Sequence, residues 1–156
     1  MSQPARNLYE VYICTTPEKL WDAITNGALT QQYFYGGILN DGPLSPGSPM
    51  TYRDGEGAVL TDGKVLEIDP PRKLVQTWSA AWMPAGERDP DSKITWEITQ
   101  LGDACKLAIT HEHPDGETET AKSTTEGWPI ILSGLKTLVE TGKRLEIKFP
   151  EEAATA

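Results

Sequence analysis

Residues 93–100 and 106–113 form two neighbouring segments in which apolar and polar side chains alternate strictly. A period of two is typical of a β-strand that packs one face and exposes the other. Leu101, Gly102 and Asp103 supply a turn between the segments, so we expect an antiparallel hairpin. Its packed face should carry every second side chain: Ile94, Trp96, Ile98, Leu107, Ile109 and His111.

The element that covers this face is predicted near the C-terminus. Apolar residues recur there at helical spacing: Trp128, Ile131, Leu132, Leu135, Leu138 and Val139. Ser123 and Glu126 have the spacing of a capping box, and Gly142 is a typical C-terminal stop signal. Pro129 lies early in this helix and predicts either a kink or a helix that restarts there.

The N-terminal part of the chain predicts one strand followed by two short helices. Residues 9–14 alternate and are rich in β-branched and aromatic side chains, which indicates a strand. Thr16 and Pro17 are a suitable N-cap and first residue for a short helix that Gly27 ends. A second short helix is expected over residues 28–33.

The middle of the chain is a series of short strand candidates separated by turn signals. A loop rich in proline, glycine and serine covers residues 41–49. The strands are expected at residues 50–53, 58–68, 73–80, 93–100 and 106–113. Connections this short favour an antiparallel meander over β-α-β units. We therefore predict an α+β fold in which a curved antiparallel sheet of about six strands wraps around a long C-terminal helix. A single domain is expected over residues 1–156, with an ordered core of about residues 7–149.

Composition and charge exclude several classes of protein. The 156 residues are 38% hydrophobic and 24% charged, which is ordinary for one globular domain. The net charge of −9 comes with scattered lysines and arginines, so nucleic acid is not an expected partner. No apolar run is long enough to cross a bilayer and no signal sequence opens the chain, so we expect a cytoplasmic protein without membrane insertion.

Neither the cysteines nor the histidines form a recognisable metal or cofactor motif. Cys14 and Cys105 are far apart, so two free thiols are expected unless their strands are adjacent. His111 and His113 occupy alternate strand positions, but no third or fourth zinc ligand is recognisable. We therefore predict no metal and no cofactor, and we expect His113 to be a solvated turn residue beside Pro114.

Five segments, in this order, resemble a known superfamily. They are Ile13-x-x-x-Pro17-Glu18-x-Leu20-Trp21-x-Ala23-Ile24; Gly63-x-Val65-x-Glu67-Ile68-Asp69-Pro70-Pro71-Arg72-x-Leu74-Val75-x-Thr77-Trp78; Trp96-Glu97-Ile98; Leu107-x-Ile109-Thr110-His111-Glu112; and Gly127-Trp128 leading into Leu132-x-x-Leu135. Together they resemble the START-like or Bet v 1-like (SRPBCC) superfamily, and within it the branch related to the activator of heat-shock-protein-90 ATPase. The resemblance covers roughly the whole chain and implies a helix-grip fold with a cavity between the sheet and the final helix. Members of the wider superfamily bind lipids, steroids, hormones and polyketides, and a minority are enzymes. The motifs of this branch are structural, so the resemblance transfers no catalytic residue.

A hydrophobic or aromatic small molecule is the predicted ligand of this cavity, because such pockets are mainly apolar with a few polar groups. His111 is the candidate polar anchor, since a neutral imidazole can donate at one nitrogen and accept at the other. The alternative is a core histidine bonded to the backbone. Two loops with large apolar side chains either form the rim of the pocket or cap the core. The predicted ligand-binding residues are Trp78, Trp96, Ile98, Ile109, His111, Trp128, Leu132, Leu135, Tyr33, Phe34, Trp82 and Met83.

Two other functions remain open alongside binding. An enzyme of cyclase or hydrolase type would use the same cavity and needs a buried acid beside His111. Glu67 and Glu97 are expected on solvated faces, so binding is favoured over catalysis and no catalytic residue is predicted. A co-chaperone-like interaction module needs an apolar or charged patch on the outer surface. A protein partner is therefore possible, and both a monomer and a homodimer stay open.

Overall fold

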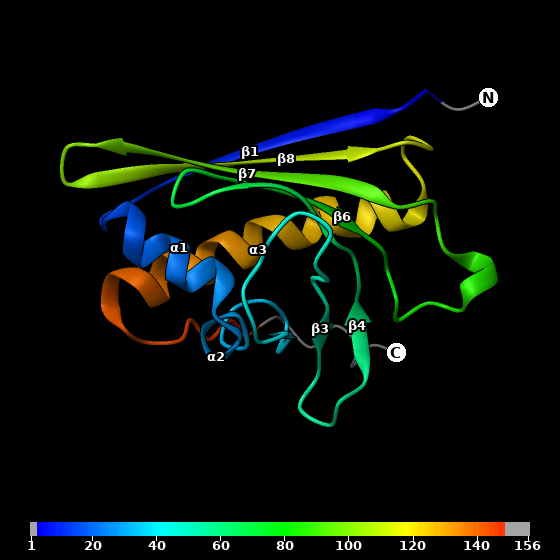
Figure 1. The fold of residues 1–156 in the computed structure, drawn as a ribbon, viewed down its shortest axis with the longest axis horizontal. Helices are drawn as coiled ribbons and strands as arrows, with labels where there is room; N and C mark the ends of the chain where they lie inside the picture. Colours follow the sequence, from blue (N-terminus) through cyan, green and yellow to red (C-terminus); the bar gives the residue numbers. More distant parts are fainter. Residues whose placement is uncertain (1–2, 149–156) are drawn as a thin grey trace.

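A long C-terminal helix packs beneath an antiparallel sheet, as the computed structural model of the chain shows (Figure 1). The structure describes residues 3–148, so residue 149, the predicted end of the ordered core, lies outside the described residues. The elements follow in the order β1 (Ala5–Ile13), α1 (Pro17–Thr25), α2 (Gly27–Thr30), β2 (Ile38–Leu39), β3 (Tyr52–Arg53), β4 (Val59–Thr61), β5 (Val65–Asp69), β6 (Lys73–Trp78), η1 (Ala85–Glu87), β7 (Ser92–Leu101), β8 (Ala104–His113) and α3 (Glu119–Thr141).

The strands form two separate sheets rather than one sheet of about six strands. The main sheet has five antiparallel strands in the order β1-β8-β7-β6-β5, and a small sheet has the order β2-β3-β4. The predicted strand at residues 58–68 is divided into β4 and β5, and between them isolated antiparallel bridges join Asp62 to Ser79 and Lys64 to Pro49. A Cβ at Gly63 would lie 1.9 Å from the carbonyl oxygen of Thr77, so only glycine permits this approach to β6. The predicted α+β helix-grip fold is confirmed.

The two short helices follow the first strand as predicted, although their boundary is different. Thr16 caps α1 by accepting a hydrogen bond from the backbone N–H of Lys19, and Pro17 is its first residue. Gly27 is the first residue of α2 and not a stop signal, so the expected second helix at residues 28–33 is shorter and begins earlier. A Cβ at Gly27 would lie 2.4 Å from the carbonyl oxygen of Leu39 in β2, which explains the glycine.

The helix α3 is longer than predicted and passes through its proline without interruption. Its N-cap is Thr118, whose side chain accepts from the N–H of Ala121, so the predicted capping box at Ser123 is wrong. The predicted restart at Pro129 is also wrong. Both Pro129 and the residue four positions earlier are exposed, so the carbonyl that loses its N–H donor can bond to water. Gly142 ends the helix with a φ of 77°.

The core lies between α3 and the inner face of the β7–β8 hairpin, whose register follows the sequence alternation. Trp96 faces Ile109 across the hairpin, and both side chains are buried. The indole N–H of Trp96 donates to the side-chain oxygen of Gln76 on β6 at 2.7 Å, so this buried polar pair is satisfied. Glu97 is exposed, which confirms the predicted orientation of β7.

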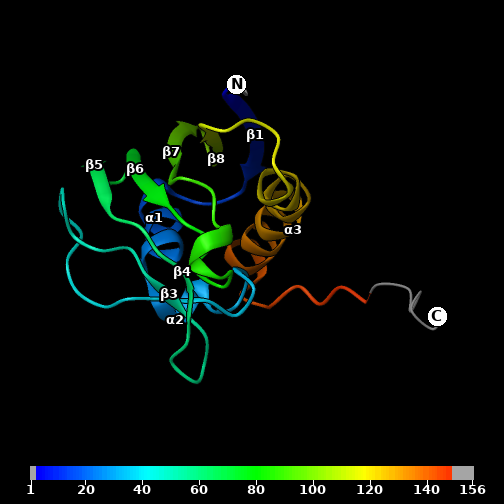
Figure 2. The same cartoon turned by 90° about the vertical axis from the view of Figure 1, so that its right-hand side faces the viewer.

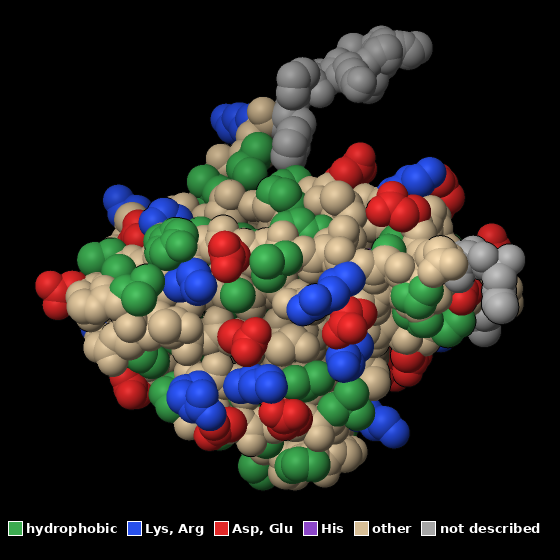
Figure 3. All heavy atoms as spheres, turned by 90° about the horizontal axis from the view of Figure 1, so that it is seen from above, with side chains coloured by type: hydrophobic (Ala, Val, Ile, Leu, Met, Phe, Trp, Pro, Cys, Tyr) green, Lys and Arg blue, Asp and Glu red, His purple; other side chains and the backbone are tan. Residues whose placement is uncertain are grey.

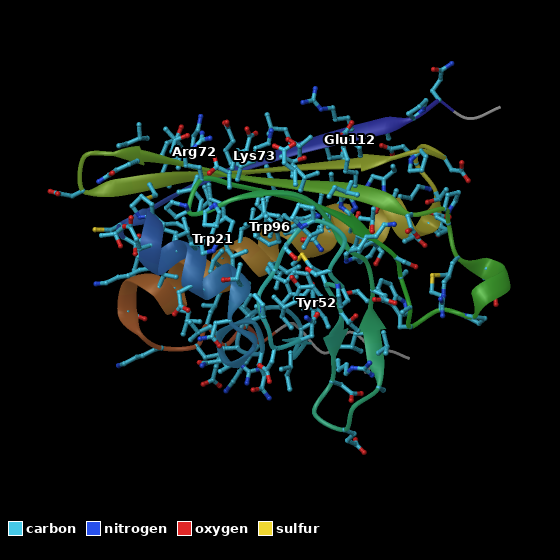
Figure 4. The ribbon with its side chains drawn as sticks, in the orientation of Figure 1. Trp21, Tyr52, Arg72, Lys73, Trp96 and Glu112 are labelled. Atoms are coloured by element: carbon cyan, nitrogen blue, oxygen red, sulfur yellow. The ribbon has the colours of Figure 1, made fainter. Side chains whose placement is uncertain are left out.

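Charged side chains occupy the outer face of the main sheet. Arg72, Lys73 and Glu112 point away from α3, whereas Trp96 points toward it (Figure 4). Lysines and glutamates from neighbouring strands form ion pairs here, including Lys73–Glu67 at 3.1 Å and Lys93–Glu112 at 3.5 Å. Acidic and basic groups are interspersed over this face with scattered apolar side chains (Figure 3). No helix within residues 3–148 is long and apolar enough to cross a membrane.

We expect Trp96→Ala to lower the free energy of unfolding by about 3–5 kcal/mol, because it leaves a cavity in the core. The substitution also removes the indole N–H that donates to the side-chain oxygen of Gln76. The neighbouring substitution Glu97→Ala removes an exposed side chain and should change stability by less than about 0.5 kcal/mol. Urea denaturation of the two variants measures both values. Equal effects of the two substitutions would contradict the packing described here.

Candidate functional site

A cavity of about 300 Å³ lies between the first half of α3, the inner face of the main sheet and the small sheet. Figure 2 looks nearly along α3 and shows the helix to one side, β1, β7 and β8 above and the β3–β4 hairpin below. The cavity is lined by Phe34 and Tyr35 after α2, Tyr52 on β3, Leu60 and Thr61 on β4, Trp78 on β6, Trp82 in the following loop, His111 on β8, and Ser123, Thr124, Gly127, Trp128 and Ile131 on α3.

Aromatic rings make up most of the cavity wall and pack against one another. Phe34 stacks on Tyr52 with ring centroids 4.5 Å apart, and it meets Trp128 edge to face at 6.2 Å. On the opposite side, the Trp78 ring meets the rings of Trp82 at 5.7 Å and His111 at 5.5 Å, both edge to face. Rings held in this way have little rotamer freedom, so the cavity is largely formed before a ligand arrives.

Two of the aromatic residues lie at the mouth of the cavity. Tyr35 is 61% exposed and Trp82 is 50% exposed, although both line the cavity. The Tyr35 side chain lies against α3 at Gly127, where an added Cβ would be 3.4 Å from the tyrosine hydroxyl. Large rings that are half in solvent at a cavity entrance are available to cover an apolar ligand.

The lining contains no aspartate, glutamate, lysine or arginine among the residues that the structure describes. A charged ligand group inside the cavity would therefore lose its hydration without gaining a counter-ion, which is costly. The same part of the chain contains no group of three or more histidine, cysteine or acidic residues placed to hold a metal. The cavity suits a neutral, largely apolar molecule.

His111 is buried in the wall and both of its ring nitrogens bond to protein groups. The indole N–H of Trp128 donates to Nδ1 at 3.0 Å, so Nδ1 carries no proton and Nε2 carries the one proton of the neutral ring. Nε2 lies 2.8 Å from Oγ of Ser92, and it donates to that oxygen. The Ser92 hydroxyl in turn donates to the carbonyl oxygen of Trp78 at 3.2 Å. Each donor in this chain of hydrogen bonds has an acceptor.

This arrangement limits what His111 can do chemically. Ser92 and His111 have the separation of a nucleophile and its general base, but Nε2 already holds a proton and cannot take one from the hydroxyl. Burial first, and then the nearby His113 ring, lower the pKa of His111 to about 3, so the ring is neutral at physiological pH. Within residues 3–148 no acid bonds to the imidazole, because Trp128 occupies Nδ1 and Ser92 occupies Nε2. The predicted polar anchor lies on the cavity wall, but both of its nitrogens are already bonded within the protein.

His113 is buried rather than solvated, so that prediction is wrong. Its ring lies 4.0 Å from the ring of His111, and it is 4% exposed. The strand β8 continues through His113, which pairs with Ala5 of β1, so the alternation that places His111 inward places His113 inward as well. Burial lowers the pKa of His113, while Asp89 and Glu117 act in the opposite direction.

The structure brings five of the predicted ligand-binding residues to the cavity: Phe34, Trp78, Trp82, His111 and Trp128. The other seven lie outside its lining. Six are buried in the core: Tyr33, Trp96, Ile98, Ile109, Leu132 and Leu135. Met83 is half-buried, and its sulfur accepts a hydrogen bond from Thr120. The physical reason is the position of the cavity, which meets α3 only up to Ile131, so that Leu132 and Leu135 lie in the core instead.

The remaining lining residues were not predicted. Tyr35, Gly127 and Ile131 adjoin predicted residues in the sequence, so proximity was a usable signal for these three, whereas Ser123 and Thr124 lie five and four positions before Trp128. Tyr52, Leu60 and Thr61 belong to the small sheet, which the sequence pattern merged with the main one. No local signal shows that a two-residue strand folds away from the main sheet to close a cavity.

The two buried histidines should make stability depend on pH below neutrality. In the unfolded chain a histidine binds its proton near pH 6.5, whereas burial lowers the pKa of His111 to about 3. The unfolded state therefore binds more protons as the pH falls below about 6.5, and this part of the stability is progressively lost toward pH 3. The loss per histidine is at most about 1.4 kcal/mol per pH unit. His113 acts in the same direction.

Urea denaturation at pH 7.5 and pH 5 measures this dependence. We expect wild type to lose stability between these values and His111→Gln to lose less, whatever its absolute stability. Glutamine does not titrate, but it can still accept from Trp128 and donate to Ser92. Identical pH dependence in the two proteins would show that His111 does not titrate on unfolding.

Comparisons with known proteins agree with this architecture. The family model described as "Activator of Hsp90 ATPase homolog 1-like protein" matches residues 14–140. The solved structure of protein MLL2253 from Mesorhizobium loti is 25% identical, with a TM-score of 0.72, over 89% of this chain and 99% of that one. The Aha1 dimer from Colwellia psychrerythraea is 20% identical, with a TM-score of 0.70, over 89% of this chain and 98% of that one.

A third solved structure, DynU16, is described as a putative protein in the dynemicin biosynthetic locus. It is 22% identical with a TM-score of 0.72, and the match covers 89% of this chain but 48% of DynU16. Comparison with curated proteins finds no match. Since the family model covers most of the chain, this protein belongs to the family of activator of Hsp90 ATPase homolog 1-like proteins, within the START-like or Bet v 1-like superfamily.

Proposed function

We propose that this protein binds a neutral, apolar or aromatic small molecule in the cavity between α3, the main sheet and the small sheet. The observation that carries the proposal is a cavity of about 300 Å³ whose wall is mainly aromatic and has no charged side chain among the described residues. Small-molecule sites span ~300–1,000 Å³, so the volume suits a compact ligand.

The packing of the wall supports a site rather than a packing defect. An apolar space of this size forfeits dispersion contacts and reduces stability. Here the space is nevertheless framed by ring pairs such as Phe34–Tyr52, which hold the walls apart. Tyr35 and Trp82 leave large apolar surfaces in solvent at the entrance. A bound apolar molecule would offset both costs by burying these surfaces.

Binding is favoured over the cyclase or hydrolase alternative by the state of His111. A general base needs a free lone pair and a pKa near the working pH. Both nitrogens of His111 are engaged, and its pKa is lowered to about 3. DynU16, from a biosynthetic locus, shares the fold, which supports a role near small-molecule chemistry without assigning a reaction to this chain.

The co-chaperone-like alternative finds less support on the surface. The outer face of the main sheet carries paired charges of both signs rather than one apolar or single-sign patch (Figure 3). A homodimer stays open, since the Colwellia psychrerythraea relative is described as a dimer. We also place the protein in the cytoplasm as part of this proposal, because Cys14 and Cys105 are both free thiols.

A matched pair of dyes tests the cavity and its preference for neutral ligands. N-phenyl-1-naphthylamine is neutral, and 1-anilinonaphthalene-8-sulfonate is the same fluorophore with a sulfonate. We expect the neutral dye to bind native protein at least about tenfold more tightly, because an unpaired sulfonate is costly to bury. Fluorescence titration at physiological ionic strength gives both dissociation constants.

Substitution within the cavity should remove this binding. Gly127→Leu places an isobutyl group beside Tyr35, where it fills the space under the cavity mouth. Ser133→Leu adds the same side chain at an exposed position of α3 and serves as the control. We expect Gly127→Leu to weaken binding of the neutral dye by about tenfold or more and Ser133→Leu to leave that binding unchanged. Native protein that binds neither dye would contradict the proposal.

A further inference from the structure

Tyr35 occupies a backbone conformation that its side chain disfavours. Its φ is 51°, and every other residue with a positive φ within residues 3–148 is a glycine. The left-handed conformation brings a Cβ too close to the following carbonyl oxygen, so it costs free energy for any residue other than glycine. A bulky aromatic residue there is an outlier that calls for a physical reason.

A tight turn imposes this conformation on Tyr35. Tyr35 and Gly36 are its central residues, both with positive φ, and the N–H of Gly37 donates to the carbonyl oxygen of Phe34 at 2.8 Å. Turns of this type I′ pattern favour glycine, asparagine and aspartate at both central positions. The base of the turn is fixed from α2, because the hydroxyl of Thr30 donates to the carbonyl oxygen of Gly37 at 2.9 Å. The turn therefore keeps its shape even though position 35 carries an unfavourable residue.

Packing in the free protein does not account for the tyrosine. Its side chain is 61% exposed, whereas its neighbour Phe34 is buried and stacks on Tyr52. The exposed ring nevertheless lines the cavity. Residues held in strained conformations cluster at ligand clamps and switch regions, where function maintains them. A large ring in a strained turn beside an apolar space is thus explained by contact with a ligand.

A second locally unfavourable residue meets the same ring. Gly127 lies inside α3, where glycine is less favourable than alanine because of its backbone freedom. Gly134 on the same helix has a packing reason, since a Cβ there would lie 3.1 Å from the Cβ of Tyr33. At Gly127 an added Cβ would meet only Tyr35, at 3.4 to 3.9 Å, which is ordinary contact. The free protein therefore does not require this glycine, which leaves room between α3 and the Tyr35 ring.

The other side of the cavity mouth is braced. Trp82 packs edge to face on Trp78 with ring centroids 5.7 Å apart. The guanidinium of Arg88 donates to the carbonyl oxygens of the residues before and after Trp82, at 3.1 and 2.8 Å. Tyr35 instead faces the open space left by Gly127. The Tyr35 ring is therefore the part of the mouth that can adjust to a ligand.

We infer that Tyr35 is a ligand-binding residue that closes the cavity mouth over an aromatic ligand, and that Gly127 provides the room in which its ring moves. This inference rests on the proposed binding function and adds the covering residue and the aromatic class of the ligand. Both exposed side chains at the mouth, Tyr35 and Trp82, are aromatic, and ring pairs are stabilised beyond the area they bury. Burial of the Tyr35 ring in the complex offsets the unfavourable local conformation of the free protein.

Three variants test the role of the ring, with N-phenyl-1-naphthylamine as the ligand. Tyr35→Asn removes the ring and suits a left-handed turn, and Tyr35→Phe keeps the ring. Tyr12→Asn makes the same replacement at a tyrosine on β1 that is 55% exposed and lies outside the cavity lining, so it serves as the control. Fluorescence titration gives the dissociation constants, and thermal denaturation without ligand gives the melting temperatures.

We expect Tyr35→Asn to weaken binding of the dye by about tenfold, because the covering ring is lost. The melting temperature of the free variant should equal or exceed that of wild type, because asparagine tolerates the left-handed conformation. Tyr35→Phe should bind the dye within about threefold of wild type, and Tyr12→Asn should bind it equally well. Loss of binding without loss of stability is the signature of a residue kept for its ligand.

The opposite results overturn the inference. A lower melting temperature of Tyr35→Asn, with or without weaker binding, would show that the ring supports the fold of the free protein. Equal losses of binding in Tyr35→Asn and Tyr35→Phe would assign the effect to the hydroxyl rather than to the ring.

Gly127→Ala tests the room beside the ring. Alanine favours the helix, so the melting temperature should rise, while its methyl group occupies the space next to Tyr35 and should weaken the dye by about threefold or more. Ser133→Ala also favours the helix, at an exposed position of α3, and should leave binding unchanged. Binding by Gly127→Ala as tight as that of wild type would show that the ring does not use this space.

The outcomes separate this inference from the proposed function. If wild type does not bind the dye, the proposed function fails and the inference fails with it. If wild type and Tyr35→Asn bind the dye equally well, the cavity is a binding site but Tyr35 does not cover the ligand.

Discussion

The hydrogen bond from the Trp128 indole to His111 joins α3 to the main sheet at the wall of the cavity. It fixes the position of the helix over β8, and by occupying Nδ1 it also fixes the tautomer of the imidazole. The proton on Nε2 then engages Ser92, which bonds to the backbone of β6. One polar contact therefore connects α3, β8, β7 and β6 inside an otherwise apolar interior, where such networks are stable only when every member is satisfied.

The residues that surround the cavity come from three parts of the structure: α3, the main sheet and the small sheet. β4 ends just before Gly63, where the absence of a Cβ lets the chain approach β6 closely. Tyr52 on β3 stacks on Phe34, and both residues line the cavity. The Trp96 ring in the core meets the ring of Trp128 on α3 edge to face at 5.5 Å, so the cavity wall and the core share this residue.

The sequence predicted the features that arise from local periodicity. The alternation around Trp96 gave the correct register of the β7–β8 hairpin, and the helical spacing gave the covering helix. The family resemblance gave the helix-grip arrangement. The small sheet was missed because β3 has two residues and β4 has three, too few to show a period. His113 was missed because the adjacent proline was given more weight than the alternation that continues through it.

The limits of sequence reasoning at the site have the same physical origin. His111 was correctly placed on the inner face, but whether its nitrogens point to a ligand depends on Trp128, seventeen residues away on another element. Whether a buried hydroxyl such as that of Thr61 has a hydrogen-bond partner depends on contacts between elements, which the sequence does not show. The residue that the sequence indicated as the polar anchor is satisfied within the protein. The small sheet belongs to the same core as the main sheet, since Leu39 on β2 and Tyr52 on β3 are each 1% exposed and pack within it.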